Sequence, residues 1–123
     1  MANEITFTAS LTFNKPAVMS SAIARSVTAL LRNVTGNFYI QDTMSVTTAA
    51  LAIPQGSVVT PHWAFFQNLD PTNYLTLFNG ASGAVFARLL AGDCAFVPLD
   101  PACVPWAQAN TAACQMEYLI ISS

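Results

Sequence analysis

Few side chains in this sequence could carry out chemistry. His62 is the only histidine among the 123 residues, and it lies between Pro61 and Trp63. General acid–base or nucleophilic catalysis needs a base paired with a second reactive group, and a metal-dependent jelly-roll enzyme needs several histidines plus a carboxylate. A single imidazole therefore indicates a packing or interface role for His62, and we expect no catalytic residue and no cofactor.

Three carboxylates fall in predicted turns, at Asp70, Asp93 and Asp100. Turns at one end of a β-sandwich can converge on a hard cation such as Ca²⁺, which prefers oxygen ligands. An Asp in a turn more commonly accepts hydrogen bonds from its own backbone amides. We therefore expect these residues to cap their turns and expect no metal site, with a calcium site as the weaker alternative.

The three cysteines, Cys94, Cys103 and Cys114, are an odd number without the CxxC spacing of a zinc or redox site. This pattern predicts buried free thiols. The sequence opens with Met1 to Phe7, which lacks the charged and apolar regions of a secretory signal. We therefore expect synthesis in the cytoplasm.

Ionic side chains are scarce throughout. Only 8% of residues are charged, with four Lys/Arg, six Asp/Glu and a net charge of −2, whereas a soluble domain carries about 25%. Four cations can neutralise little phosphate, which argues against nucleic-acid binding. The sequence has no apolar run of about 18 residues, so it predicts no membrane-spanning helix. Because mixed surface charge keeps soluble proteins apart, we expect this chain to be one subunit of an assembly.

Hydrophobic alternation predicts strands along most of the chain. Residues 5–13 place Ile5, Phe7, Leu11 and Phe13 on one face, with hydroxyl side chains on the other. Residues 20–34 fit a helix or a strand, and their β-branched side chains favour a strand. Further strands are expected at 38–46, 49–53, 63–68, 74–78, 85–90, 94–99, 106–109 and 115–121. Segments 63–68 and 74–78 are expected to form a hairpin, and 115–121, apolar on both faces, to be a central strand.

This spacing predicts an all-β fold, an antiparallel β-sandwich in the form of a small jelly roll of about 8–10 short strands. We expect residues 1–123 to form a single sandwich domain, with 1–13 as an N-terminal arm or edge strand. Docking by strand addition is the role expected of that arm.

Aromatic residues could form a strip that stacks on sugar rings, which is the usual chemistry of a carbohydrate-binding module. Trp63 and Trp106 are the candidates for such a strip. Aromatic residues on strands are more often core or subunit contacts, and we favour that interpretation. The candidate interface residues are Ile5, Phe7, Leu11, Phe13, Trp63 and Trp106.

Three segments between residues 63 and 121 contain Asn68-Leu69-Asp70, Thr72-Asn73-Tyr74, the Ala91-Gly92-Asp93 turn, Ala109-Asn110-Thr111-Ala112 and the closing Glu117-Tyr118-Leu119-Ile120. With these motifs the segments resemble a family of small tailed-bacteriophage virion proteins. The first half of the chain resembles the family only in its strand alternation.

The resemblance implies a non-enzymatic structural protein of a phage particle, made in the bacterial host cytoplasm and located in the virion. The leading expectation is a capsid decoration or cement protein that forms a homo-oligomer, specifically a trimer, and binds the major capsid protein. The alternatives are a tail-tip, baseplate or fibre component that binds a tail protein, and a glycan-binding β-sandwich module.

Overall fold

The computed structural model describes residues 4–18, 20–32 and 34–122. Within these residues the chain forms ten strands in antiparallel sheets. The chain divides into two compact units, Met1–Thr35 and Gly36–Ser123. The all-β class and the antiparallel sandwich predicted from the sequence are confirmed.

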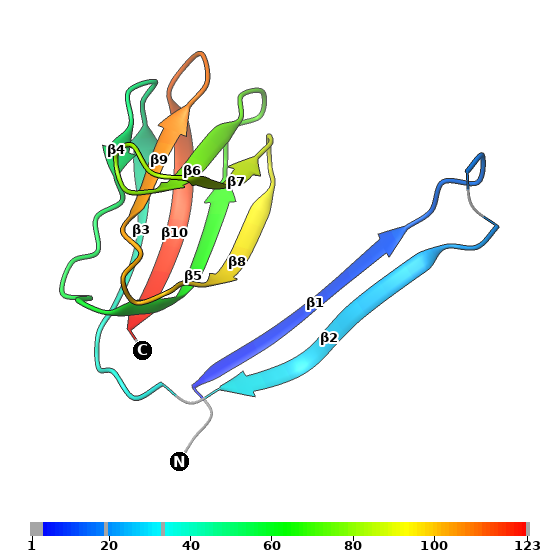
Figure 1. Cartoon of the computed structure of the whole chain (residues 1–123), viewed down its shortest axis with the longest axis horizontal. Coiled ribbons are helices and arrows are strands. Elements are labelled where there is room, and N and C mark those ends of the chain that lie inside the picture. Colours follow the sequence, from blue (N-terminus) through cyan, green and yellow to red (C-terminus); the bar gives the residue numbers. More distant parts are fainter. Residues whose placement is uncertain (1–3, 19, 33, 123) are drawn as a thin grey trace. The chain divides into compact units, whose positions relative to one another are not determined.

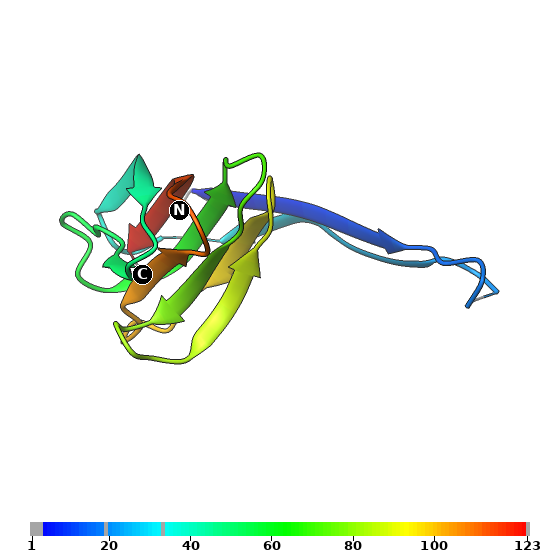
Figure 2. The ribbon, with the colours of Figure 1, turned by 90° about the horizontal axis from the view of Figure 1, so that it is seen from above.

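The first unit is a long two-stranded hairpin. Strand β1 (Ile5–Phe13) pairs with β2 (Ile23–Arg32), and the two strands run together along their length (Figure 1, Figure 2). The register shifts between Phe7 and Ala9, where β2 contributes one extra residue. Such a bulge increases the local twist of a ribbon. The strands expected over residues 5–13 and 20–34 correspond to β1 and β2. Asn33, which falls within 20–34, lies outside the described residues.

The second unit is a sandwich of two four-stranded sheets (Figure 1). One sheet has the order β3-β10-β5-β8, and the other has the order β4-β9-β6-β7. The strands are β3 (Tyr39–Val46), β4 (Leu51–Ala52), β5 (Pro61–Asn68), β6 (Leu75–Asn79), β7 (Val85–Leu89), β8 (Cys94–Pro98), β9 (Pro105–Ala109) and β10 (Cys114–Ser122).

The pairing of these strands defines a jelly roll. Strands β6 and β7 pair with each other, and so do β5 with β8, β4 with β9, and β3 with β10. This nesting is that of one long hairpin rolled into two sheets, which is the jelly-roll arrangement. Strand β10 lies between β3 and β5, so its prediction as a central strand is confirmed.

Alternate residues of the central strands point into the core. Met116, Tyr118 and Ile120 of β10 are buried together with Ala64 and Phe66 of β5. The facing sheet contributes side chains that include Leu75, Leu77 and Ala107. The period-two burial of β5, β6, β9 and β10 fixes which side chains point outward, and this matters for the surfaces described below.

Two expectations differ from the structure. The segments expected to form a hairpin, now β5 and β6, lie in different sheets: β5 pairs with β10 and β8, and β6 pairs with β7 and β9. The Asn-Asp-Pro connection between them crosses from one sheet to the other. The sandwich expected over 1–123 occupies Gly36–Ser123. Within the segment 1–13, expected as an N-terminal arm or edge strand, β1 is an edge strand of the two-stranded hairpin, and residues 1–3 lie outside the described part.

Candidate interaction surfaces

His62 has a packing role. Its Nδ1 lies 2.8 Å from the carbonyl oxygen of Leu99, so this nitrogen carries the proton and donates it. The ring also meets Trp63 edge-on, with centroids 4.5 Å apart. The hydrogen bond to Leu99 fastens the beginning of β5 to the segment that follows β8, which is the packing role that its sequence context indicates.

The turn carboxylates cap their own loops, as the sequence predicts. Asp70 accepts from the backbone N–H of Thr72 at 2.8 Å and from that of Asn73. Asp93 accepts from Leu90 at 3.0 Å, and Asp100 accepts from Ala102 at 2.8 Å. The Asn73 and Thr72 bonds lower the pKa of Asp70. Among the described residues, no group of three His, Cys, Asp or Glu side chains is placed to hold a metal ion.

The cysteines differ in exposure. Cys103 and Cys114 are buried, as expected, and burial raises the pKa of both thiols. Cys94 is exposed at the start of the edge strand β8, which differs from the expectation. Its register explains this exposure, because Cys94 pairs with Gln67 and projects with it to the outward side of the sheet.

Four of the motifs singled out between residues 63 and 121 meet at one corner of the sandwich, and the closing Glu117-Tyr118-Leu119-Ile120 lies within β10. Asn68 is fully buried, and its Nδ2 lies 2.8 Å from the Asn73 carbonyl oxygen and 3.1 Å from those of Leu89 and Leu90. Its Oδ1 accepts from the N–H of Asp70 at 3.0 Å. One side chain thus joins the end of β5, the following loop and the end of β7.

The Ala109-Asn110-Thr111-Ala112 motif reaches the same corner. Thr111 donates its hydroxyl to the Oδ1 of Asn73 at 2.9 Å, and the Asn110 N–H donates to the Tyr74 carbonyl at 3.2 Å. Arg88 lies over the Tyr74 ring, 4.5 Å from its centroid. These hydrogen bonds are structural, so the motifs specify a fold corner rather than a reactive centre.

The hairpin has one apolar face. In its register Leu11 pairs with Arg25, Phe13 with Ile23 and Ala9 with Val27, and paired residues project to the same side. Leu11 is 70% exposed and Phe13 52% exposed, whereas Ile5 and Phe7 on this face are partly buried. We call this side the hairpin apolar face, made of Ile5, Phe7, Ala9, Leu11, Phe13, Ile23, Arg25, Val27, Leu30 and Arg32.

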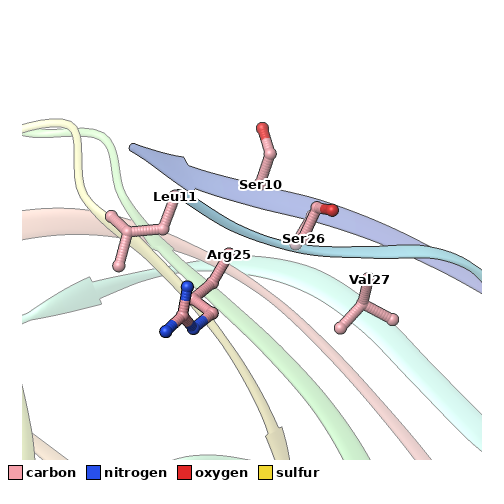
Figure 3. Close-up of a pocket in the computed structure, with 6 residues that line it drawn as sticks. Ser10, Leu11, Arg25, Ser26 and Val27 are labelled. Carbon is pink, nitrogen blue, oxygen red and sulfur yellow. The ribbon is translucent and has the colours of Figure 1, made fainter. Parts of the chain in front are cut away.

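The opposite side of the hairpin carries hydroxyl groups. Ser10 pairs with Ser26, and both point away from Leu11, Arg25 and Val27 (Figure 3). Thr6, Thr8 and Thr12 alternate onto the same side. A hollow of about 350 Å³ is lined by Ala9, Ser10, Leu11, Arg25, Ser26 and Val27. Leu31 and Ala24 share the hydroxyl side as the partners of Thr6 and Thr12. A ribbon with one mainly hydroxyl face and one mainly apolar face is typical of a strand pair that packs on one side only.

A second apolar surface lies on the outside of the β3-β10-β5-β8 sheet. Registers place Tyr39, Ile121, Trp63 and Pro98 in one row across the four strands. The next row contains Gln41, Leu119, Phe65 and Phe96. Trp63 and Phe96 stack with centroids 5.8 Å apart. We call these eight side chains the outer sheet face.

This surface departs from the usual antiparallel pattern. One face of such a sheet normally packs on the core while the other carries polar residues. Here Gln41 is the one amide side chain in the first two rows, and the third row is polar where Glu117 lies beside Gln67. The sequence indicated Trp63 as an interface residue but did not indicate Phe65, Leu119 or Ile121. The apolar character of both faces of residues 115–121 was the available indication, and it was interpreted only as a central position in the sheet.

Charge is divided unevenly between the two units. Residues 1–35 contain Lys15, Arg25 and Arg32 against Glu4, a net charge of +2. Residues 36–123 contain Arg88 against five carboxylates, a net charge of −4. The hairpin is therefore cationic and the sandwich anionic.

The two tryptophans lie on different sheets. Trp63 projects outward from β5, and Trp106, partly buried, projects outward from β9 in the facing sheet. They therefore do not form one aromatic strip. Of the six candidate interface residues, four share the hairpin apolar face, Trp63 belongs to the outer sheet face, and Trp106 lies apart.

Comparisons of the chain with protein-family models, curated proteins and solved structures find no match. Among the described residues, no helix has the length and apolar character needed to cross a membrane.

Proposed function

We propose that this chain is a non-enzymatic structural subunit of a tailed-phage virion, a decoration or cement protein that assembles through its own hairpin. The observation that carries the assembly role is the hairpin apolar face. A two-stranded hairpin is marginally stable in water, and long unprotected edge strands readily pair with other chains. An exposed amphipathic hairpin therefore suits a subunit whose surface is covered by neighbours.

The virion setting is supported by the sequence resemblance across residues 63–121 and is consistent with the jelly roll, an architecture that viral capsid proteins use. The hydrogen-bonded corner around Asn68 gives the shared motifs a structural reason, because they hold both sheets in place. The partners proposed are further copies of this chain, in a trimer, and the major capsid protein. Many modest apolar contacts repeated on a lattice act together, so no single contact needs to be strong.

Two measurements test the proposal. Light scattering at tens of micromolar should give a mass above that of one 13.1 kDa chain, and a clean monomer would contradict the assembly role. Quantitative mass spectrometry of purified phage particles that encode the chain should give hundreds of copies per particle. A handful of copies would instead support the tail-tip, baseplate or fibre placement, and complete absence would contradict the virion role.

A further inference from the structure

We propose that the outer sheet face binds the hairpin of a second copy of this chain, so that each subunit donates its hairpin and receives another. This inference rests on the proposed assembly role and names the surface and the partner that would produce it. Three observations lead to it: an exposed apolar face on the hairpin and a half-buried one on the outside of the sheet, opposite net charges, and a short connection between the units.

The two surfaces are alike in apolar character. The hairpin apolar face follows the nine residues of β1, and the two rows of the outer sheet face cross all four strands of their sheet. The hairpin offers aliphatic side chains and Phe13 on one side, while the outer sheet face offers Trp63, Phe65 and Leu119. Burying the apolar side of the ribbon leaves its serine and threonine hydroxyls in water, where their hydrogen bonds are satisfied.

Charge favours this pairing over contact between two hairpins. The hairpin apolar face carries Arg25 and Arg32, whose guanidinium groups donate to the carbonyls of Ala24 and Leu31. Two such faces placed together would bring four cations into contact. On the outward side of the receiving sheet, the paired residues include one ionised side chain, Glu117. It lies in the row next to Phe65 and Leu119. A cationic ribbon on this anionic sandwich is electrostatically complementary.

The connection between the units favours a second copy as the receiver. Val34 is held to the hairpin because its N–H donates to the Glu4 carboxylate at 3.0 Å. Phe38 is held to the sandwich through reciprocal bonds with Ser122, one of which is 3.0 Å long. Only Thr35, Gly36 and Asn37 lie between these attachments, and three residues span at most about 11 Å. Short hinges of this kind favour exchange between subunits.

The geometry of exchange has a consequence for symmetry. A contact between a hairpin and a different surface is heterologous, so it closes into a ring or continues as a filament. A three-membered ring satisfies every hairpin and every outer sheet face, which agrees with the trimer proposed above.

The test uses the full chain and four substitutions. Leu11→Asp places a carboxylate on the hairpin apolar face, and Ser10→Asp places the same group on the hydroxyl face as its matched control. Leu119→Glu alters the outer sheet face, and Gln108→Glu alters the outward side of the facing sheet. Light scattering measures the mass of each variant, and circular dichroism with urea unfolding verifies that each one folds.

We expect Leu11→Asp and Leu119→Glu each to weaken self-association about tenfold or more, because a buried charge at an interface centre is strongly unfavourable. Both control variants should keep the wild-type mass. Mixing the two defective variants should restore a species with the mass of two chains, because one intact hairpin then meets one intact outer sheet face. In the unsubstituted chain, thiol labelling of Cys94, beside Gln67 on that side of the sheet, should slow as concentration rises.

Different failures have different meanings. If the wild-type chain is oligomeric and either defective variant keeps its mass, the pairing of hairpin and outer sheet face is overturned while the assembly role stands. If the mixture stays monomeric, or if Cys94 labelling does not depend on concentration, the pairing is also overturned. If the wild-type chain is a monomer, both proposals fail.

Discussion

The side-chain amide of Asn68 donates to the carbonyl oxygen of Leu89 at 3.1 Å and thereby joins the end of β5 to the end of β7 in the facing sheet. Four carbonyl and amide groups of the main chain depend on this one buried side chain. The Asn68 side chain therefore links the two sheets of the jelly roll at this corner.

Replacing Asn68 with Ala should destabilise the sandwich by about 2–4 kcal/mol, because buried backbone groups lose their partners. Urea unfolding followed by tryptophan fluorescence measures the change. Thr111→Val removes an exposed hydrogen bond at the same corner and serves as the control, with an expected loss below about 1 kcal/mol. Equal losses in the two variants would contradict the proposed importance of Asn68.

Gly83 should not tolerate a side chain. A Cβ at this position would lie 1.4 Å from the backbone oxygen of Asn79, so the loop between β6 and β7 would have to move. We expect Gly83→Ala to cost about 2 kcal/mol or more, which is the scale of local backbone strain. The neighbouring exposed Ser82→Ala should change the unfolding free energy by less than about 0.5 kcal/mol. A neutral Gly83→Ala variant would show that this loop is free to rearrange.

Asp70 should make stability depend on acid pH. Hydrogen bonds from the N–H groups of Asn73 and Thr72 lower its pKa below the ordinary value of 3.8. A lowered pKa stabilises the fold above the unfolded-state value, and this contribution disappears as pH falls through the folded-state value. The advantage of wild type over Asp70→Asn in unfolding free energy should therefore shrink between about pH 6 and about pH 3. A constant difference over this range would contradict the capping role of the carboxylate.

The cysteines should separate by reactivity. At low micromolar concentration, a thiol reagent should label Cys94 quickly because it is exposed. Cys103 and Cys114 should react only after urea unfolding, because burial removes access and raises the pKa of each thiol. Mass spectrometry counts the labels, and rapid labelling of Cys114 in the folded chain would contradict its burial.

The sequence was sufficient for local features and insufficient for long-range ones. Alternation along residues 5–13 predicted a strand, and the turns at Asp70 and Asp93 predicted that these carboxylates cap backbone N–H groups. These features depend on neighbouring residues. Turn residues at 68–73 indicated a reversal, but they do not specify whether the chain returns in the same sheet, so β5 and β6 were wrongly paired.

The surfaces were harder to predict for the same reason. Both surfaces depend on the register between segments that are distant in the sequence. This register pairs β1 with β2 and places Trp63 beside Phe65, Phe96 and Leu119. Nothing in the spacing of one strand contains that information. The low charge of the chain did indicate that apolar surface remains outside the core, without indicating where it lies.

The central position of β10 has a consequence for the timing of folding. The hairpin joins residues 5–32 through local pairing and can form while the rest of the chain is still being synthesised. The sheet that would receive it stays divided until residues 114–122 leave the ribosome, because β10 pairs with both β3 and β5. A nascent chain would therefore have its hairpin before it has the outer sheet face that would bind the hairpin of another copy. Association between subunits would then wait until synthesis of the chain is nearly complete.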